Sequence, residues 1–540
     1  MCDETPRHPP SENTVNHPTE TTEPSSTVLT DPKDQRNILI AMCTALIAVI
    51  ASVSGLNVAQ QDLAIDLGAS QSAVLWIINA YTIALAALLL PIGAIGDRWG
   101  RKPVLLTGLA VFGLASLGAA LAPTVGLMIA ARVAAGVGAA MIMPVTLSVI
   151  TSSFPPEDRA RAIGIWAGFA GSGGILGLWV SAFMVDVVTW RWLFVLPIGL
   201  VIVSAIASVM FVPNSVEHAT HRFDIGGSLL SALAIGGIVL GIHEGPERGW
   251  TDPITLAGTI VGVVALVAFV MWERRQANPL LDMSAFRDRG LSSGSATLLI
   301  VFAVMFGIFL VLFPYLQAVV GWSALRAAAG LLPMAAVMMP MSTLAPRVAA
   351  RFGSRATMIT GVAIFGIGMM TLALRASVEG GYMSVLPGLM ILGFGMGLTM
   401  TPATEAITAT LPQEKQGVAS ALNDTSREVG GALGVALLGS ILSSGYRSAI
   451  EPALEGLPPE LAEHASEGIG SAYAVAAEAG DAAPQIIDAA QHAFVEGWVS
   501  SMWIGVALAG VALAVLVFRG PGTGKAVAPA ADREFEIASA

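Results

Sequence analysis

The chain has 540 residues, of which 54% are hydrophobic and only 12% are charged, and its mean hydropathy is +0.73. No soluble domain hides so much apolar surface, so the composition predicts an all-α polytopic membrane protein. The formal net charge of −11 argues against a nucleic-acid partner. The two cysteines, Cys2 and Cys43, fall in a polar tail and in the first apolar run, which argues against a disulfide framework.

The lengths of the apolar runs predict fourteen membrane-spanning helices, since about 20 consecutive apolar residues cross a hydrocarbon core. A Ser-, Thr- and Pro-rich tail of residues 1–35 precedes them, and we expect it to be disordered and cytoplasmic. Residues 443–493 are predicted to form an acidic extracellular loop, and residues 519–540 a second cytoplasmic tail. The predicted helices cover residues 37–59, 73–95, 103–122, 126–150, 160–184, 192–212, 224–243, 254–272, 291–319, 327–349, 355–375, 384–410, 417–442 and 494–518.

The distribution of positive charge predicts the orientation. With fourteen helices, about twenty Lys and Arg residues fall on one side of the membrane and about five on the other. Basic loops stay in the cytoplasm, so both termini are expected there, in a multi-pass protein of the cell (plasma) membrane. An odd number of helices would mix the two sets of loops.

A short charged turn between the second and third predicted helices carries the most specific motif. It reads Gly-x-x-x-Asp-Arg-x-Gly-Arg-Lys and resembles the signature loop of the major facilitator superfamily, which gates the cytoplasmic side. The alternative is an ordinary topogenic loop, but such a loop needs the cations and not the glycines or the acid. The candidate gating residues are Gly93, Asp97, Arg98, Gly100, Arg101 and Lys102.

The chain also repeats itself at an offset of about 253 to 257 residues. Residues 98–108 align with 351–361, and residues 144–151 align with 402–409, so helices 2–5 correspond to helices 10–13. Two similar halves with a site between them are typical of facilitator-type transporters, and this resemblance implies the major facilitator fold. The expected parts are a six-helix half at 36–212, a linker with two inserted helices at 213–290, and a six-helix half at 291–518.

Gly249-Trp250, which follows Glu244-Gly-Pro-Glu247, resembles the fourteen-helix drug:proton antiporter branch of this superfamily. The resemblance implies a secondary active transporter that exports hydrophobic or amphiphilic small molecules, drugs included, in exchange for protons by alternating access. A uniporter or importer on the same fold stays open, and so does a membrane sensor or scaffold without transport. We expect a monomer without cofactor or metal, not an enzyme, whose partners are its substrate, protons and the lipid bilayer.

Asp97 is expected to act as a latch. The motif glycines let the second and third helices turn tightly, which places the carboxylate near the N-terminus of another helix, where its charge gains roughly 0.3–1 kcal/mol. The repeat predicts that this partner is the thirteenth helix, which begins near Gly417.

Charged residues within the spans are the candidates for proton coupling, because a charge near the bilayer centre usually faces a cavity or a partner. Arg132 lies in a stretch that resembles the family's fourth-helix arginine motif, and snorkelling to the outer surface is its alternative role. Asp424 can reach Arg427 at i+3 and neighbours Glu428 at i+4. One cation between two acids leaves a carboxylate that can take up a proton, although a static ion pair is equally open. Glu405 is a third acidic candidate.

Two motifs of the antiporter branch are incomplete. The first helix lacks the acid of the branch and keeps Asn57 and Ala59, and the fifth helix has Leu178 where the branch has proline. The resemblance therefore leaves the coupling role to the thirteenth helix. The residues expected to line the substrate cavity are Asn57, Trp76 and Tyr81.

Overall fold

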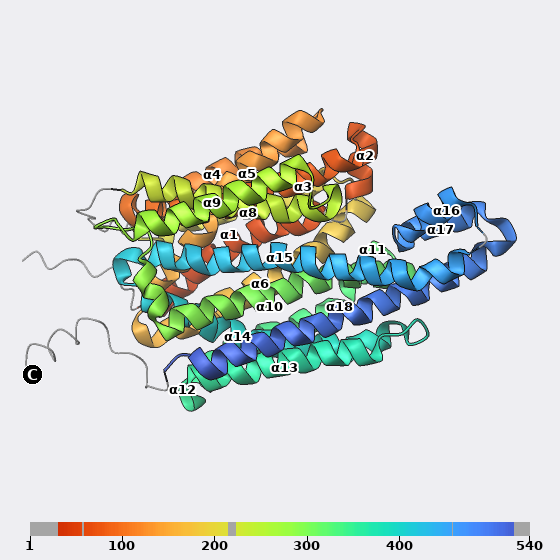
Figure 1. The fold of residues 1–540 in the computed structure, drawn as a ribbon. Helices are drawn as coiled ribbons and strands as arrows, with labels where there is room; N and C mark the ends of the chain where they lie inside the picture. The colour runs from red at the N-terminus through yellow and green to blue at the C-terminus, as the bar shows by residue number, and fades with distance from the viewer. Residues whose placement is uncertain (1–30, 57–58, 214–222, 456, 523–540) are drawn as a thin grey trace, which may run out of the picture.

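The computed structural model describes residues 31–522, apart from 57–58, 214–222 and 456. The described residues are helical with short connections and contain no β-strand. Fourteen of their helices are long and apolar enough to cross a membrane, which confirms the predicted number and the all-α class. Figure 1 shows these helices running roughly along one common axis.

The first half contains six long helices and one short connector. Side chains that precede the helices define two of the starts: Ser70 Oγ accepts a hydrogen bond from Ala73 N at 3.3 Å, and Thr124 Oγ1 accepts one from Leu127 N at 3.4 Å. The helices are α1 (Pro32–Leu56), α2 (Gln60–Leu67), α3 (Gln71–Trp99), α4 (Arg101–Ala120), α5 (Val125–Ser153), α6 (Pro156–Val187) and α7 (Trp192–Phe211).

The second half begins where Asp288 Oδ1 accepts hydrogen bonds from Gly290 N at 2.7 Å and Leu291 N at 3.1 Å. A π-helical turn extends its first helix. The elements are α10 (Arg289–Pro314), η2 (Tyr315–Val319), α11 (Ala324–Ala329), α12 (Leu332–Phe352), α13 (Ser354–Arg375), α14 (Gly381–Thr410), η3 (Gln413–Lys415), α15 (Gln416–Ile450) and α18 (Ala483–Arg519).

The internal repeat has a structural counterpart in two tight turns. Gly100 joins α3 to α4 with a φ of 101°, and Gly353 joins α12 to α13 with a φ of 88°. Residues with side chains rarely adopt such values, so both turns require glycine. We call the end of the bundle with these turns the turn end, and the opposite end the cap end.

The inserted helices α8 (Ile225–Arg248) and α9 (Pro253–Glu273) pack against each other, and α8 also contacts α3 and α15. Its Val239 is fully buried in a small cluster with Ala86 of α3 and Ala432 of α15. The insertion therefore covers a seam between the halves. The short helix η1 (Met283–Arg287) follows it and leads into α10.

The segment between the last two membrane helices is shorter than predicted. Helix α15 continues to Ile450 and α18 starts at Ala483, so the helical ends occupy much of the loop expected at 443–493. Figure 1 shows the intervening helices projecting beyond the bundle at the cap end. They are η4 (Glu451–Leu454), α16 (Pro459–Ser466), α17 (Ile469–Glu478) and η5 (Gly480–Ala482).

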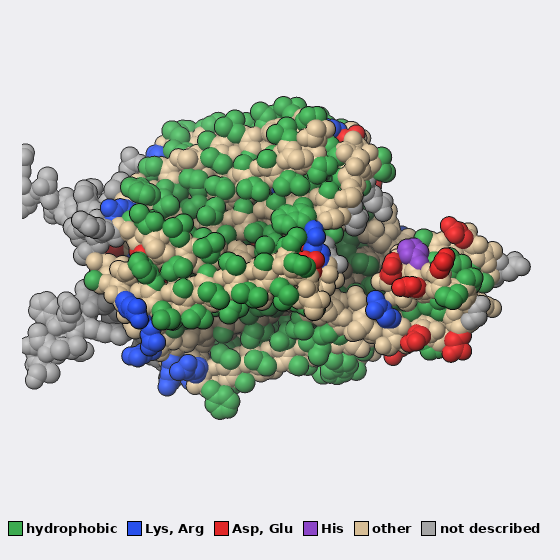
Figure 2. Space-filling view, turned by 45° about the horizontal axis from the view of Figure 1, so that its top comes forward, with side chains coloured by type: hydrophobic (Ala, Val, Ile, Leu, Met, Phe, Trp, Pro, Cys, Tyr) green, Lys and Arg blue, Asp and Glu red, His purple; other side chains and the backbone are tan. Residues whose placement is uncertain are grey.

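Side-chain types are unevenly distributed over the surface. Figure 2 shows hydrophobic side chains over the sides of the bundle, whereas most of the visible Asp and Glu side chains lie on the projecting α16–α17 segment. Apolar sides with charged ends are what a helix bundle in a lipid bilayer requires.

Candidate functional site

The carboxylate of Asp97 caps the N-terminus of α15. Its Oδ1 accepts a hydrogen bond from Gly417 N at 2.8 Å, and its Oδ2 accepts one from Val418 N at 3.1 Å. These amides have no partner within their own helix, and the positive end of the helix dipole favours the negative charge. The contact expected from the repeat is therefore present, and it joins the two halves.

Arg101 adds a second link across the same seam. Its Nη2 donates to Asp97 Oδ1 at 3.2 Å and to the carbonyl of Gln413, just before α15, at 3.1 Å. Arg101 is only 2% exposed, so this pair is shielded from water. Lys102 stays within the first half, where its Nζ donates to Val209 O at 2.9 Å, and Arg98 is half-buried at the end of α3.

Gly93 allows α3 and α15 to come close enough for these bonds. A Cβ atom at this position would lie 2.5 Å from Gly417 O and 2.7 Å from Ala421 Cβ, distances that real Cβ atoms do not tolerate. The motif thus combines a close helix contact at Gly93, an acid at Asp97 and a tight turn at Gly100.

Arg132 lies in α5 and is fully buried. Its Nε donates to Ile77 O of α3 at 3.2 Å, and its Nη1 donates to Ser52 Oγ of α1 at 2.9 Å. The guanidinium also lies 4.3 Å from the centre of the Tyr81 ring, at cation–π distance. The side chain joins three helices instead of snorkelling to the surface, and it forms no ion pair among the described residues.

The three residues expected in the substrate cavity have different surroundings. Tyr81 is fully buried under Arg132, and its hydroxyl donates to Val49 O at 3.3 Å, so it lines no open cavity in this conformation. Trp76 is half-buried on α3, next to Ile77. Asn57 lies outside the described residues.

Asp424 and Arg427 form a buried ion pair on α15, in which Arg427 Nη1 lies 3.4 Å from Asp424 Oδ1. Asn423 Nδ2 donates to the same oxygen at 3.1 Å, and Thr404 Oγ1 of α14 donates to Asn423 Oδ1 at 2.9 Å. The second oxygen, Asp424 Oδ2, is buried without a hydrogen-bond partner in the described part of the chain. A buried carboxylate with an unused oxygen is suited to accept a proton.

Arg427 also reaches the opposite half. Its Nη2 donates to Ala170 O of α6 at 3.4 Å, and its guanidinium lies 5.6 Å from the ring centre of Trp166 on the same helix. On its own half, the guanidinium lies 4.6 Å from the ring centre of Phe302 in α10. The ion pair thus contacts both halves of the protein.

Glu428 and Glu405 differ from Asp424. Both are half-buried, and neither makes a hydrogen bond or ion pair through its carboxylate among the described residues. Glu428 lies within electrostatic range of Arg427 and of Tyr81, which connects the α15 cluster to the Arg132 cluster. Glu405 of α14, in the second half, is close enough to Arg159 of α6, in the first half, for their charges to attract each other.

Comparison with known proteins identifies the family. The family model of the Major Facilitator Superfamily matches residues 40–435. The chain belongs to the Major Facilitator Superfamily. This facilitator is 30% identical over 425 residues to the multidrug resistance protein Stp of Mycobacterium tuberculosis, covering 78% of each chain. It is 33% identical over 482 residues to the multidrug efflux pump LfrA of Mycolicibacterium smegmatis, covering 88% of this chain and 94% of LfrA.

Solved structures show the same fold at low sequence identity. The proton:xylose symporter XylE superposes with a TM-score of 0.60 and 12% identity over 92% of this chain and 98% of its own. A bacterial homologue of the human lysosomal transporter Spinster, in an inward-facing and occupied conformation, superposes with a TM-score of 0.55 and 19% identity. The superposition covers 91% of this chain and 97% of the homologue. Both share the facilitator architecture with this chain.

Several partners of the charged residues in this facilitator escape sequence reasoning. Trp166 and Phe302 belong to different helices, and no motif marks them. Ser52 stands where the first-helix motif of the antiporter branch has its acid, which is a signal for this position. The repeat contains one signal, because the offset that aligns Pro155 with Pro412 places Ala170 opposite Arg427. Residues that occupy equivalent positions in the two halves are expected to meet where they lie near the pseudo-twofold axis. Arg427 and Ala170 do so, through the hydrogen bond from Arg427 Nη2 to Ala170 O. Among the described residues, no group of three or more His, Cys, Asp or Glu side chains could hold a metal ion.

Proposed function

We propose that this facilitator is a proton-coupled exporter of hydrophobic or amphiphilic small molecules that works by alternating access. Its relatives include a multidrug efflux pump and a multidrug resistance protein, and both align over most of their length. The observation that carries the proposal is the buried Asp424–Arg427 pair between the two halves. A charged pair in the interior of a membrane protein is expensive to maintain, which argues that it has a function.

The proposed cycle begins with the latch of Asp97 closed at the turn end, which we assign to the cytoplasm. When Asp424 takes up a proton, its carboxyl group becomes neutral and its attraction for Arg427 falls. Arg427 can then exchange its contacts with α6, and the relative energy of the two conformations of the halves changes. Substrate and proton are coupled because both act on this equilibrium.

Arg132 has a supporting role in this proposal. It holds α1, α3 and α5 together through Ser52, Ile77 and Tyr81, and Tyr81 lies within electrostatic range of Glu428. The protein acts as a monomer in the plasma membrane, with both termini in the cytoplasm and with the substrate, protons and lipid as its partners.

The test uses purified protein in proteoliposomes with an imposed pH gradient and a panel of amphiphilic dyes and drugs. Wild-type protein should concentrate at least one compound against its gradient. Asp424→Asn cannot exchange the proton, so it should lose uphill transport but keep substrate binding or downhill movement. Glu428→Gln, four residues further along the same helix, tests the second candidate carboxylate and should retain uphill transport if Asp424 is the group that exchanges the proton.

Two results would contradict the proposal. A wild-type protein that equilibrates compounds without responding to the pH gradient would be a uniporter. A double variant Asp424→Asn, Glu428→Gln that still concentrates substrate under a pH gradient alone would move the coupling site elsewhere, and Glu405 would be tested next.

A further inference from the structure

Two carboxyl groups meet at the turn end of the inserted helices. Asp224 is the residue before α8 and Glu273 is the last residue of α9, and their side chains lie within hydrogen-bond range of each other. A Cβ atom on Gly227 would lie 2.1 Å from Glu273 Oε1 and 2.6 Å from Asp224 Oδ2. Both oxygens therefore border one small space, which exists because residue 227 has no side chain.

One oxygen of this pair has no donor. Glu273 is only 2% exposed, and its Oε1 is buried without a hydrogen-bond partner among the described residues. Its Oε2 accepts a hydrogen bond from Leu281 N at 3.2 Å. Asp224 Oδ1 accepts one from Gly227 N at 2.8 Å, and Trp272 Nε1 lies 3.0 and 3.2 Å from the two Asp224 oxygens. Two adjacent carboxylates repel each other when both are charged, so such a pair binds a proton or a cation.

The donors around the pair favour a proton over a metal ion. Ca²⁺ and Mg²⁺ take about six or more oxygen ligands. Here three N–H groups already point at the carboxyl oxygens, and their positive ends would repel a metal ion. One shared proton leaves a single negative charge, which the three donors stabilise. Arg274 and Arg275, the next charged residues after Glu273, are exposed to solvent.

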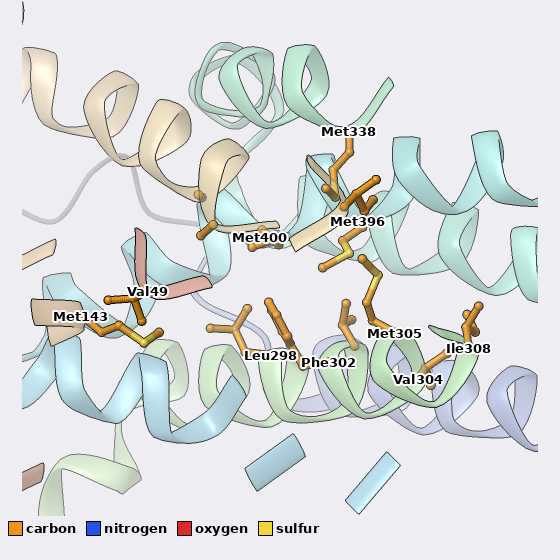
Figure 3. Close-up of a cluster of buried hydrophobic side chains, with 14 of the residues drawn as sticks. Val49, Met143, Leu298, Phe302, Val304, Met305, Ile308, Met338, Met396 and Met400 are labelled. Carbon is orange, nitrogen blue, oxygen red and sulfur yellow. The ribbon is translucent and has the colours of Figure 1, made fainter. Parts of the chain in front are cut away.

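Glu273 fastens the linker between α9 and η1 to the inserted helices through its bond to Leu281 N. Leu280 and Leu281 are buried in the main hydrophobic cluster, part of which Figure 3 shows, so the position of this N–H group is fixed. The next residue, Asp282, uses its carboxylate to accept a hydrogen bond from Ser284 N at 2.8 Å. The linker is thus anchored on both sides of the bond that Glu273 accepts.

The same region touches both sides of the latch. Pro279 O accepts a hydrogen bond from Lys415 Nζ at 2.8 Å, and Lys415 directly precedes α15, whose first amides bind Asp97. Lys415 also lies within electrostatic range of the acid at residue 282. In the first half, the ring centre of Phe223 lies 5.7 Å from that of Trp99 in the gating turn. The carboxyl pair is therefore connected to the latch through the linker and through Phe223.

We propose that Asp224 and Glu273 form a cytoplasmic proton-binding site, separate from Asp424, that holds the turn end closed when it is occupied. With the proton bound, the two carboxyl groups share a hydrogen bond, and α8, α9 and the linker stay together. When the pH rises and the proton leaves, two like charges repel at close range and the linker loosens from α9. Opening of the turn end then depends on cytoplasmic pH. The inference goes beyond the proposed export and does not require proton-coupled transport.

The first measurement detects the proton in the full-length protein in lipid vesicles. The infrared difference spectrum between about pH 6 and about pH 9 should contain the band of a carboxyl group that loses its proton. This band should be absent in Glu273→Gln and altered in Asp224→Asn, because a shared proton belongs to both groups. Asparagine caps a helix as well as aspartate does, so α8 should keep its start. Glu414→Gln, which changes an exposed acid at the same end, is the control and should keep the band.

The second measurement follows closure by maleimide labelling of a cysteine replacing Ser420, which is fully buried, in a background without Cys2 and Cys43. The labelling rate of the protein with Glu273 is divided by that of Glu273→Gln at the same pH, so the pH dependence of the thiol cancels. The ratio should be near one at about pH 6 and rise by up to about tenfold at about pH 9. The reason is that the introduced amide can donate to Asp224 at every pH.

Glu273→Ala distinguishes the proton site from a merely structural role. It removes the bond to Leu281 N and the second charge together, so labelling should be faster than in Glu273→Gln by the same factor at both pH values. If Glu273→Gln does not fold, as judged by size-exclusion chromatography, Asp224→Asn takes its place in the ratio. A ratio that does not change with pH, or an infrared band that neither substitution affects, would overturn the inference.

The outcomes separate this inference from the proposed export. Uphill transport driven by a pH gradient, together with a labelling ratio that is constant with pH, would refute the proton site and leave export intact. A pH-dependent ratio without any pH-driven transport by the wild type would support the site and refute proton-coupled export.

Discussion

The two turns of the repeat join the halves in different ways. At the first turn, Asp97 and Arg101 cross to α15 with charged hydrogen bonds. In the second half, the alignment places Ala350 opposite Asp97, and the side-chain hydrogen bond from α12 to α6 is neutral. It runs from Ser342 Oγ, eleven residues before the turn at Gly353, to Gly164 O at 3.0 Å. Hydrogen bonds to charged groups contribute about 1.5–3 kcal/mol, against about 0.5–1.5 kcal/mol for neutral ones.

The helix partners explain this difference. Helix α6 carries two acids in its own first turn, Glu157 and Asp158, whereas α15 has none there. An acid in the first turn stabilises a helix N-terminus, so α6 supplies its own negative charge and α15 receives it from Asp97. Opening of the turn end would therefore break a charged link on one seam and a neutral one on the other. We propose that the first seam is the switch.

The largest effect is expected from Gly93→Ala. The added Cβ would meet the α15 backbone at 2.5 Å, so the seam cannot close and transport should fall more than tenfold. Gly96→Ala, three residues further along α3, is the matched control. Its Cβ would lie 3.4 Å from Val145 Cγ2, which is an ordinary van der Waals contact, so transport should be retained. Transport in proteoliposomes measures both, and equal activities would show that close packing at Gly93 is not required.

Asp97→Asn should have the next largest effect. The amide keeps one acceptor but loses the charge, so closure of the turn end should weaken by about 1.4 kcal/mol, a factor of about ten. Closure is followed by maleimide labelling of a cysteine replacing Ser420, which is fully buried here, in a background without Cys2 and Cys43. Labelling should become faster while expression is unchanged. Unaltered labelling and normal turnover would remove Asp97 from the switch.

Glu157→Gln, at the second seam, is the control for this prediction. Its carboxylate lies in the first turn of α6 and makes no hydrogen bond across the seam among the described residues, so labelling should change less than about twofold. An effect as large as that of Asp97→Asn would show that the two seams are electrostatically equivalent.

Much of this architecture follows from the sequence, because each signal is local. Apolar run lengths predict the fourteen helices, which the structure confirms. The repeat predicts the partner of Asp97, because equivalent helices meet equivalent neighbours. The end of α15 was missed by eight residues, from 442 to Ile450, since a helix can continue beyond the apolar run once it packs against α16 and α18.

The remaining contacts depend on how the helices are rotated and paired, which local signals do not encode. Arg132 is marked by its charge and Ser52 by its place at the acid position of the first-helix motif, but neither signal shows that the two side chains meet. Similarly, the spacing of Asp424 and Arg427 predicts their ion pair, whereas the Trp166 and Phe302 rings come from different halves. Only tertiary packing brings such residues together.

Ser342→Ala should accelerate labelling of the Ser420→Cys protein about two- to threefold. It removes a neutral hydroxyl bond across the second seam, and the Gly164 carbonyl keeps its place within α6. Ser342→Thr keeps the hydroxyl and is the control for its removal. The measurement is the maleimide labelling used for Asp97→Asn, and an acceleration larger than that of Asp97→Asn would reverse the order of the two seams.

Lys102→Gln should have the smallest effect, although it belongs to the same motif as Asp97. Lys102 Nζ donates to Val209 O of α7, so its bond lies within the first half and does not change when the seam opens. Exposed substitutions away from special features usually change stability by less than about 0.5 kcal/mol, which corresponds to a factor of about two. Labelling of the Ser420→Cys protein should therefore be nearly unchanged, whereas Arg101→Gln, which removes a bond to Gln413 across the seam, should accelerate it. Equal effects of the two variants would mean that the motif acts through its total positive charge and not through the contacts that cross between the halves.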